Sequence, residues 1–113
     1  MYRTNVKIEN TMLGNEDHGI MTFMLTLSGE GWGIGFGGYA LDVWSPMHQK
    51  RIGTARGLQA IQEVLDVVGV DSWEKLKGKY IRVEMTEEFG TVTKIGNLLK
   101  DKWLDLSTFW QER

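Results

Sequence analysis

The segment GEGWGIGFGGYALD (29–42) carries a glycine at every second position of its centre, and this pattern constrains the fold most. Side chains on a β-strand alternate between two faces. The large residues Trp32, Ile34 and Phe36 therefore share one face. The other face is bare backbone, formed by Gly31, Gly33, Gly35 and Gly37. Glycine inside a strand costs roughly 0.5–1 kcal/mol per site, so four in one register need a compensating cause.

Two causes fit the bare face of this segment. A helix or second sheet of the same chain packs closely on the glycines, or they tolerate strong curvature. Alternatively, the glycines form a flat floor for a planar ligand such as a nucleobase, or for a partner chain. The sequence leaves both alternatives open.

Length and composition set outer limits on this chain. Its 113 residues, with 42% hydrophobic and 25% charged, predict one globular domain over residues 1–113. The formal charge of −2 argues against dedicated nucleic-acid binding. The absence of cysteine excludes disulfides and thiolate chemistry. No apolar run approaches the roughly 20 residues that span a bilayer, and the first residues lack a signal-peptide core. We therefore expect a cytoplasmic protein without membrane contact.

Hydrophobic periodicity predicts an α+β fold. We expect an antiparallel sheet of about five strands, arranged as a three-strand meander, a helix and a two-strand hairpin. One main helix and a short helical tail pack with it. The expected strands are 6–13, 20–27, 32–40, 79–86 and 91–96, and the expected helical segments are 54–68, 71–78, 97–103 and a last turn from Ser107 with Phe109 and Trp110. Residues 41–53, around the only proline, are predicted to be a loop.

The main helix has clear end signals. Thr54 is placed to cap its N-terminus, and Gly69 is placed to end it. Its apolar face is predicted from the helical spacing of Leu58, Ile61, Val64, Leu65 and Val68.

The stretch HQKRIGTARG (48–57) is the most favourable for an anion. Lys50, Arg51 and Arg56 surround the expected helix start at Thr54, where free N–H groups and the helix dipole attract negative charge. Three partners fit this cluster: a carboxylate of the same chain, a phosphate, or the acidic surface of a partner.

Enzymatic motifs are weak throughout the chain. The stretch GIGFGG matches the G-x-G-x-x-G dinucleotide fingerprint in letters only, because its glycines lie inside a strand and no helix follows. Glu16, Asp17 and His18 stand side by side and suggest base or metal chemistry. Adjacent turn residues seldom converge, however, so a solvated turn also explains them. We therefore predict no catalytic residue, no metal and no cofactor.

Five tryptophans are many for a chain of this length. They fit either a thin core, in which aromatic rings fill space, or an interface, where tryptophan and arginine are enriched. We expect a homo-oligomer on this basis.

Four phrases of the sequence carry a resemblance to a known group. KIENTMLGNEDHGIMTF, GWGIGFGGYALD, GVDSWEKLKGKYIRV and IGNLLKDKW resemble small, mostly unannotated accessory proteins encoded by bacteriophages and prophages. The resemblance covers most of the chain except the loop near Trp44 and the tail. It implies an accessory protein working in the bacterial host cytoplasm, where blocking host defence is a common task.

Together these features predict a phage anti-defence protein that acts by binding and is not an enzyme. It would sequester a nucleotide-derived immune signal or occlude a host defence protein such as a CRISPR effector. The alternatives are a homo-oligomeric structural module of the phage and a small hydrolase using Glu16, Asp17 or His18. For the nucleotide version, the expected ligand-binding residues are Trp32, Gly33, Gly35, Gly37, Tyr39, Lys50, Arg51, Thr54 and Arg56.

Overall fold

A computed structural model describes residues 1–107 of the chain. In chain order the elements are β1 (Tyr2–Asp17), β2 (Ile20–Gly29), β3 (Trp32–Gly37), β4 (Asp42–Ser45), β5 (Lys50–Gly53), α1 (Ala55–Val68), the 3₁₀ helix η1 (Trp73–Lys75), β6 (Tyr80–Met85), β7 (Val92–Gly96) and β8 (Trp103–Leu104). The fold is α+β with antiparallel pairing, as predicted.

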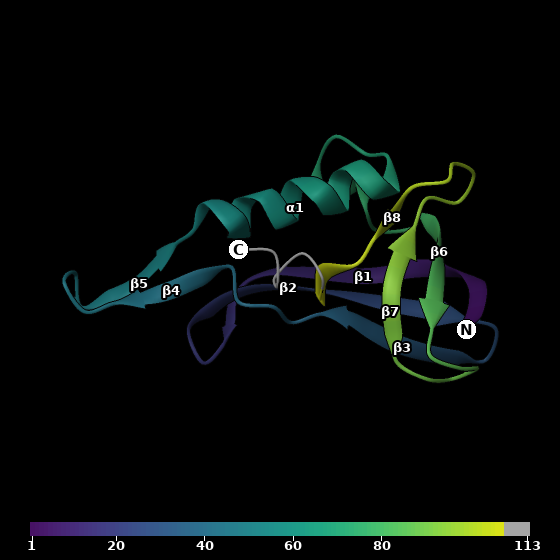
Figure 1. Ribbon diagram of the computed structural model, residues 1–113, viewed down its shortest axis with the longest axis horizontal. Coiled ribbons are helices and arrows are strands. Elements are labelled where there is room, and N and C mark those ends of the chain that lie inside the picture. Colours follow the sequence, from purple (N-terminus) through teal and green to yellow (C-terminus); the bar gives the residue numbers. More distant parts are fainter. Residues whose placement is uncertain (108–113) are drawn as a thin grey trace.

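The main sheet has six strands in the order β3-β2-β1-β6-β7-β8. The long strand β1 joins its two parts, because its first residues pair with β6 and its later residues pair with β2. A register shift between Ile8 and Asn10 marks the change, as a bulge bends a strand. Figure 1 shows β6 and β7 running across the direction of β1, β2 and β3, so the sheet folds around its own inner face.

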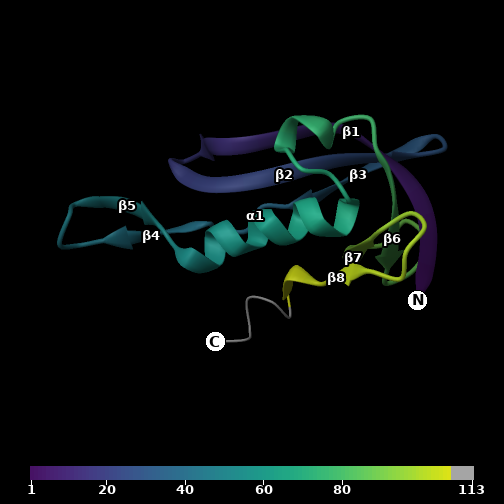
Figure 2. The ribbon, with the colours of Figure 1, turned by 90° about the horizontal axis from the view of Figure 1, so that it is seen from above.

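The hydrophobic core lies between this inner face and α1. Phe23, Leu25 and Leu27 of β2 are buried there, together with Ile81 and Val83 of β6. Packing of one amphipathic helix on one sheet face buries apolar surface on that side only. Figures 1 and 2 show α1 on this side, with β8 near the helix.

Helix α1 begins and ends as predicted. The Thr54 hydroxyl accepts a hydrogen bond from the Gly57 N–H at 2.9 Å, and Gly69 is the C-cap. The predicted apolar face was partly wrong, because the buried positions are Gly57, Ala60, Val64 and Val67. Leu58 is 63% exposed. The helix is rotated toward its small residues, which allow the Leu41 backbone to approach Gly57 closely.

Two further predictions of local structure were wrong. The segment 41–53 is a separate two-stranded antiparallel hairpin of β4 and β5, not a loop. Pro46 lies in its turn, where proline removes no ladder hydrogen bond. The segment 97–103 is a turn leading into β8, because the Asn97 side chain accepts hydrogen bonds from the backbone of Leu99 and Lys100. The predicted last turn includes Phe109 and Trp110, which lie outside the described residues.

Candidate binding surface

The bare glycine surface lies on the outer face of the main sheet, on its edge strand β3. Gly33 and Gly35 are exposed. Trp32, Ile34 and Phe36 point to the inner face and pack with the core, as alternation predicted. Helix α1 packs on that inner face, so it does not cover the two exposed glycines.

The four alternate positions differ in whether the backbone or its neighbours require glycine. Gly31 has a φ of +78° in the β2–β3 turn, and Gly37 has a φ of +127° with the Phe23 carbonyl 2.5 Å from where a Cβ would lie. Both positions therefore exclude other side chains. At Gly33 an added Cβ meets only the Leu27 carbonyl, at 3.4 Å, and at Gly35 it meets the flexible Met24 sulfur at 3.2 Å. Neither Gly33 nor Gly35 has a backbone conformation that requires glycine.

The strand neighbours of Gly35 are uncharged, whereas Gly33 lies opposite Ser28, which in turn lies opposite Lys7. Register pairing sets Gly35 opposite Thr26 and Thr26 opposite Asn10, while Met24 lies opposite Met12. Residues paired across strands share a face. We call this surface the glycine face and define it by Gly33, Gly35, Met24, Thr26, Asn10 and Met12. Its members are uncharged, and it is bordered by Lys7 and Glu9, whose charged groups lie 4.0 Å apart. Glu9 also accepts a hydrogen bond from Ser28 at 2.8 Å.

The two predicted aromatic contacts lie elsewhere. The Trp32 ring packs edge-on against Phe89, with ring centroids 5.8 Å apart, on the inner side of β3. Tyr39 packs against the core, and its carbonyl accepts a hydrogen bond from the Thr22 hydroxyl at 2.6 Å. Burial, followed by the charge of Asp105, raises the pKa of the Tyr39 phenol. Trp32 therefore does not add to the glycine face.

One member of the predicted cation cluster, Arg51, is bound to a carboxylate of the same chain. Arg51 Nε donates to Asp42 Oδ1 at 2.9 Å, and its guanidinium also reaches the Asp42 carbonyl at 3.1 Å. Asp42 is buried and accepts a further hydrogen bond from the Met21 N–H. The hydrogen bond from Arg51 is the largest effect on the pKa of Asp42 and holds it below its ordinary value. Burial acts in the opposite direction, and the hydrogen bond from the Met21 N–H adds to the lowering.

The helix entrance is also occupied by internal contacts. The Thr54 hydroxyl donates to the Leu41 carbonyl at 3.2 Å while it caps Gly57. Arg56 has an interaction within the chain. Lys50 is exposed and has no ion-pair partner in the described part of the chain.

The predicted site is thus brought together only in part. Gly33 and Gly35 share one surface, and Lys50, Arg51, Thr54 and Arg56 share another region. Figures 1 and 2 both show the β4–β5 hairpin extending from one end of the molecule, whereas β3 runs along the main sheet. The glycine face and the hairpin cations are therefore separate surfaces.

Candidate catalytic groups form only local pairs. Asp17 Oδ1 lies 2.8 Å from His18 Nδ1 on an exposed turn. Ser45 Oγ lies 2.9 Å from His48 Nδ1 in the hairpin turn, a pair that sequence analysis missed because its members belong to a predicted loop. Among residues 1–107 no group of three or more His, Asp or Glu side chains could hold a metal ion.

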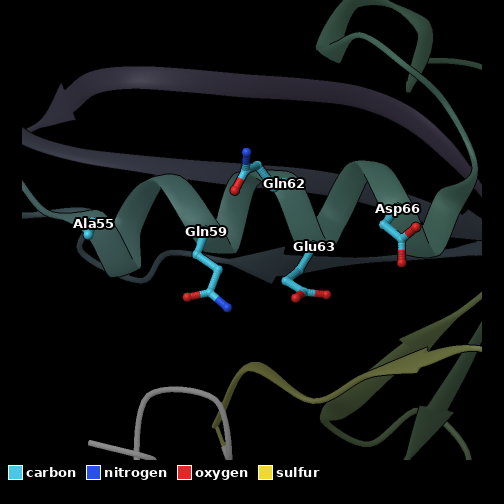
Figure 3. A pocket seen from close by; sticks show the side chains of 5 residues that line it. All are labelled: Ala55, Gln59, Gln62, Glu63 and Asp66. Carbon is cyan, nitrogen blue, oxygen red and sulfur yellow. The ribbon is translucent and has the colours of Figure 1, made fainter.

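The hollows of the surface are shallow and chemically simple. Figure 3 shows one of about 430 Å³ along α1, where Gln59 and Glu63 project from the same side of the helix. The nearby Asp66 is paired with Lys102 at 3.0 Å. A lone carboxylate among amides, with no nucleophile beside it, supports no reaction.

A second hollow, of about 570 Å³, lies beyond the end of α1. The ion pairs Lys75–Asp71 and Lys102–Asp66 occupy its rim. Two of the three lysines that line the hollow are therefore paired, and the third, Lys79, is exposed.

A third hollow, which sequence analysis missed, is apolar. It measures about 240 Å³ and lies at the root of the hairpin, lined by Leu13, Met21, Leu41, Leu58 and Ile61, among others. Sequence analysis missed this hollow because helical spacing placed the Leu58 side chain in the core, whereas it is exposed.

The surface and the fold define a small α+β protein with one uncovered sheet face and no assembled catalytic group in its described part. No protein-family model matches the sequence, and neither the curated proteins nor the solved structures include a match. None of the helices described is both long and apolar enough to cross a membrane.

Proposed function

We propose that this protein is a phage-encoded anti-defence protein that acts by binding, occluding a host defence protein such as a CRISPR effector in the bacterial cytoplasm. One observation carries the proposal. Gly33 and Gly35 are glycines on an exposed sheet face, in a conformation open to other residues. Gly33 has room for a side chain, and at Gly35 the flexible Met24 side chain would have to shift. Glycine weakens a strand, and the fold does not require it at these two positions. We therefore infer that the bare surface serves a contact with another molecule.

Binding is favoured over catalysis because the described residues bring no nucleophile and base together in a cavity. The Asp17–His18 pair that would support the hydrolase alternative lies on an exposed turn between neighbours in sequence. A reaction also needs a site that positions substrate and excludes water, and the residues of the glycine face line none of the three hollows described above.

A protein partner is favoured over a nucleotide-derived signal. The glycine face carries no charge, and Arg51, which was expected to take phosphate, is bound to Asp42. A surface of uncharged residues with two methionines suits a protein better than a phosphate-bearing ligand, because methionine adapts to irregular apolar contacts.

The test combines an infection assay with recovery of the partner. Cells carrying a defence system are infected in the presence of the wild-type protein, Gly33→Thr or Gly14→Thr. Gly14 is a matched control, because nothing lies within 4 Å of an added Cβ. It is also distant from Gly33 along the sheet. Gly14 pairs with Thr22 and Gly33 pairs with Ser28, and these two partners are six residues apart on β2, about 20 Å at 3.3 Å per residue.

We expect the wild-type protein and Gly14→Thr to restore phage growth and to retain the same host protein on purification. Gly33→Thr should lose both properties while remaining folded. Calorimetric titration with cyclic dinucleotides and cyclic ADP-ribose isomers tests the signal-sequestering version. Binding heat with one of these, and no retained host protein, would replace our proposal with that version.

A further inference from the structure

The β4–β5 hairpin is an arm that carries exposed apolar side chains. It forms its own two-stranded sheet, and Figures 1 and 2 show it extending away from the rest of the molecule. Val43, Trp44 and Met47 are 50%, 53% and 86% exposed. A two-stranded hairpin alone is marginally stable in water, so an exposed apolar arm calls for a surface to pack on.

The apolar hollow at the root of the arm is a matching acceptor. Its lining is almost entirely apolar, and Leu13 and Leu58 on its rim are exposed. The arm cannot fold back into this hollow, because its own root residues Leu41 and Gly53 form part of the lining. That root is fixed by the hydrogen bond from the Thr54 N–H to the Leu41 carbonyl and by the Asp42–Arg51 pair. An arm that fills this hollow therefore belongs to a second molecule.

Charge on the two elements is also complementary. Lys50 on the arm is exposed, and Glu16 is exposed near the end of β1, three residues beyond Leu13 of the hollow. Neither has an ion-pair partner among residues 1–107. An arm lying in the hollow of another copy would bring these opposite charges to the same rim.

We propose that two copies of this chain form a symmetric dimer in which each arm packs into the hollow at the root of the other arm. A two-fold axis uses both elements twice and closes the assembly without leaving a free arm. Each arm would place the exposed parts of Val43, Trp44 and Met47 on the apolar lining of the other copy's hollow, so the same contact forms twice. The interface is separate from the glycine face, so the two proposals stand or fall independently.

The test measures the molar mass of the full chain by light scattering and sedimentation. We expect twice the monomer mass of 12.9 kDa at micromolar concentration. Met47→Glu on the arm and Leu58→Glu in the hollow should each weaken the dimer at least about tenfold, because each places a charge in an apolar contact. Both side chains are exposed in the monomer, so thermal melting should show folded variants.

Mixing the two variants distinguishes this interface from any other. Met47→Glu has an intact hollow and Leu58→Glu has an intact arm, so their mixture regains one of the two contacts and should associate more tightly than either variant alone. Lys50→Glu should weaken the dimer about two- to fivefold, the range of a surface ion pair. Adding Glu16→Lys should restore it, whereas the control Lys77→Glu should have no effect. A wild-type monomer at about 100 µM, or a dimer unaffected by both Met47→Glu and Leu58→Glu, would overturn the proposal.

Discussion

Replacing Gly33 with threonine tests whether the fold itself requires glycine at this position or whether glycine serves a binding surface. The new side chain projects from the outer face, where its Cβ meets only the Leu27 carbonyl at 3.4 Å. Threonine restricts the unfolded chain more than glycine does and has a higher strand propensity. We therefore expect the variant to be more stable than the wild-type protein by about 0.5–1 kcal/mol.

This gain converts into a measurable shift in melting temperature. Unfolding entropy is about 2.1 cal/mol/K per residue, which gives roughly 0.24 kcal/mol/K for a chain of 113 residues. A gain of 0.5–1 kcal/mol therefore raises the midpoint by about 2–4 °C. Thermal unfolding followed by circular dichroism or calorimetry resolves a shift of this size.

The matched comparison is Gly37→Ala on the same strand. Here φ is +127° and the Phe23 carbonyl lies 2.5 Å from the added Cβ, so this variant should be less stable than the wild-type protein. If Gly33→Thr also lowers the midpoint, the fold itself requires glycine at position 33. The main support for a binding surface would then be lost, whatever the infection assay shows.

Three other predictions follow from the arm root and the helix start. Asp42→Asn should lower the free energy of unfolding by about 1–3 kcal/mol, because it leaves the Arg51 guanidinium without its carboxylate. Urea denaturation measures this change, and an unchanged midpoint would show that the Asp42–Arg51 pair contributes nothing to stability. The pKa of Asp42 is lowered by folding, so its contribution is present above the usual carboxyl value of 3.8 and is lost as pH falls through the folded pKa. Wild-type stability should therefore fall more steeply with acid below this pH than that of Asp42→Asn, and parallel curves would contradict this. Thr54→Ala should cost about 1 kcal/mol, since it removes the cap on the Gly57 N–H, while Thr54→Ser should keep most of the stability in the same denaturation assay.

Local sequence signals predicted the elements whose structure depends on neighbours along the chain. The alternation of Trp32, Ile34 and Phe36 with glycines correctly predicted which face each residue takes, because a strand has a period of two. Thr54 and Gly69 bounded the helix correctly, because caps satisfy backbone groups within one turn. These features need no knowledge of the rest of the fold.

The tertiary structure decided everything that depends on residues far apart in sequence. It left the glycine face open by placing α1 on the opposite side of the sheet, and it turned the segment around Pro46 into an arm whose root is fixed by Asp42 and Arg51. It also rotated the helix so that Leu58 lies on the surface. Periodicity identifies which face of an element is apolar, but it does not identify the element that packs on that face. Burial depends on contacts between segments that are far apart in the sequence, and local patterns carry no information on these contacts.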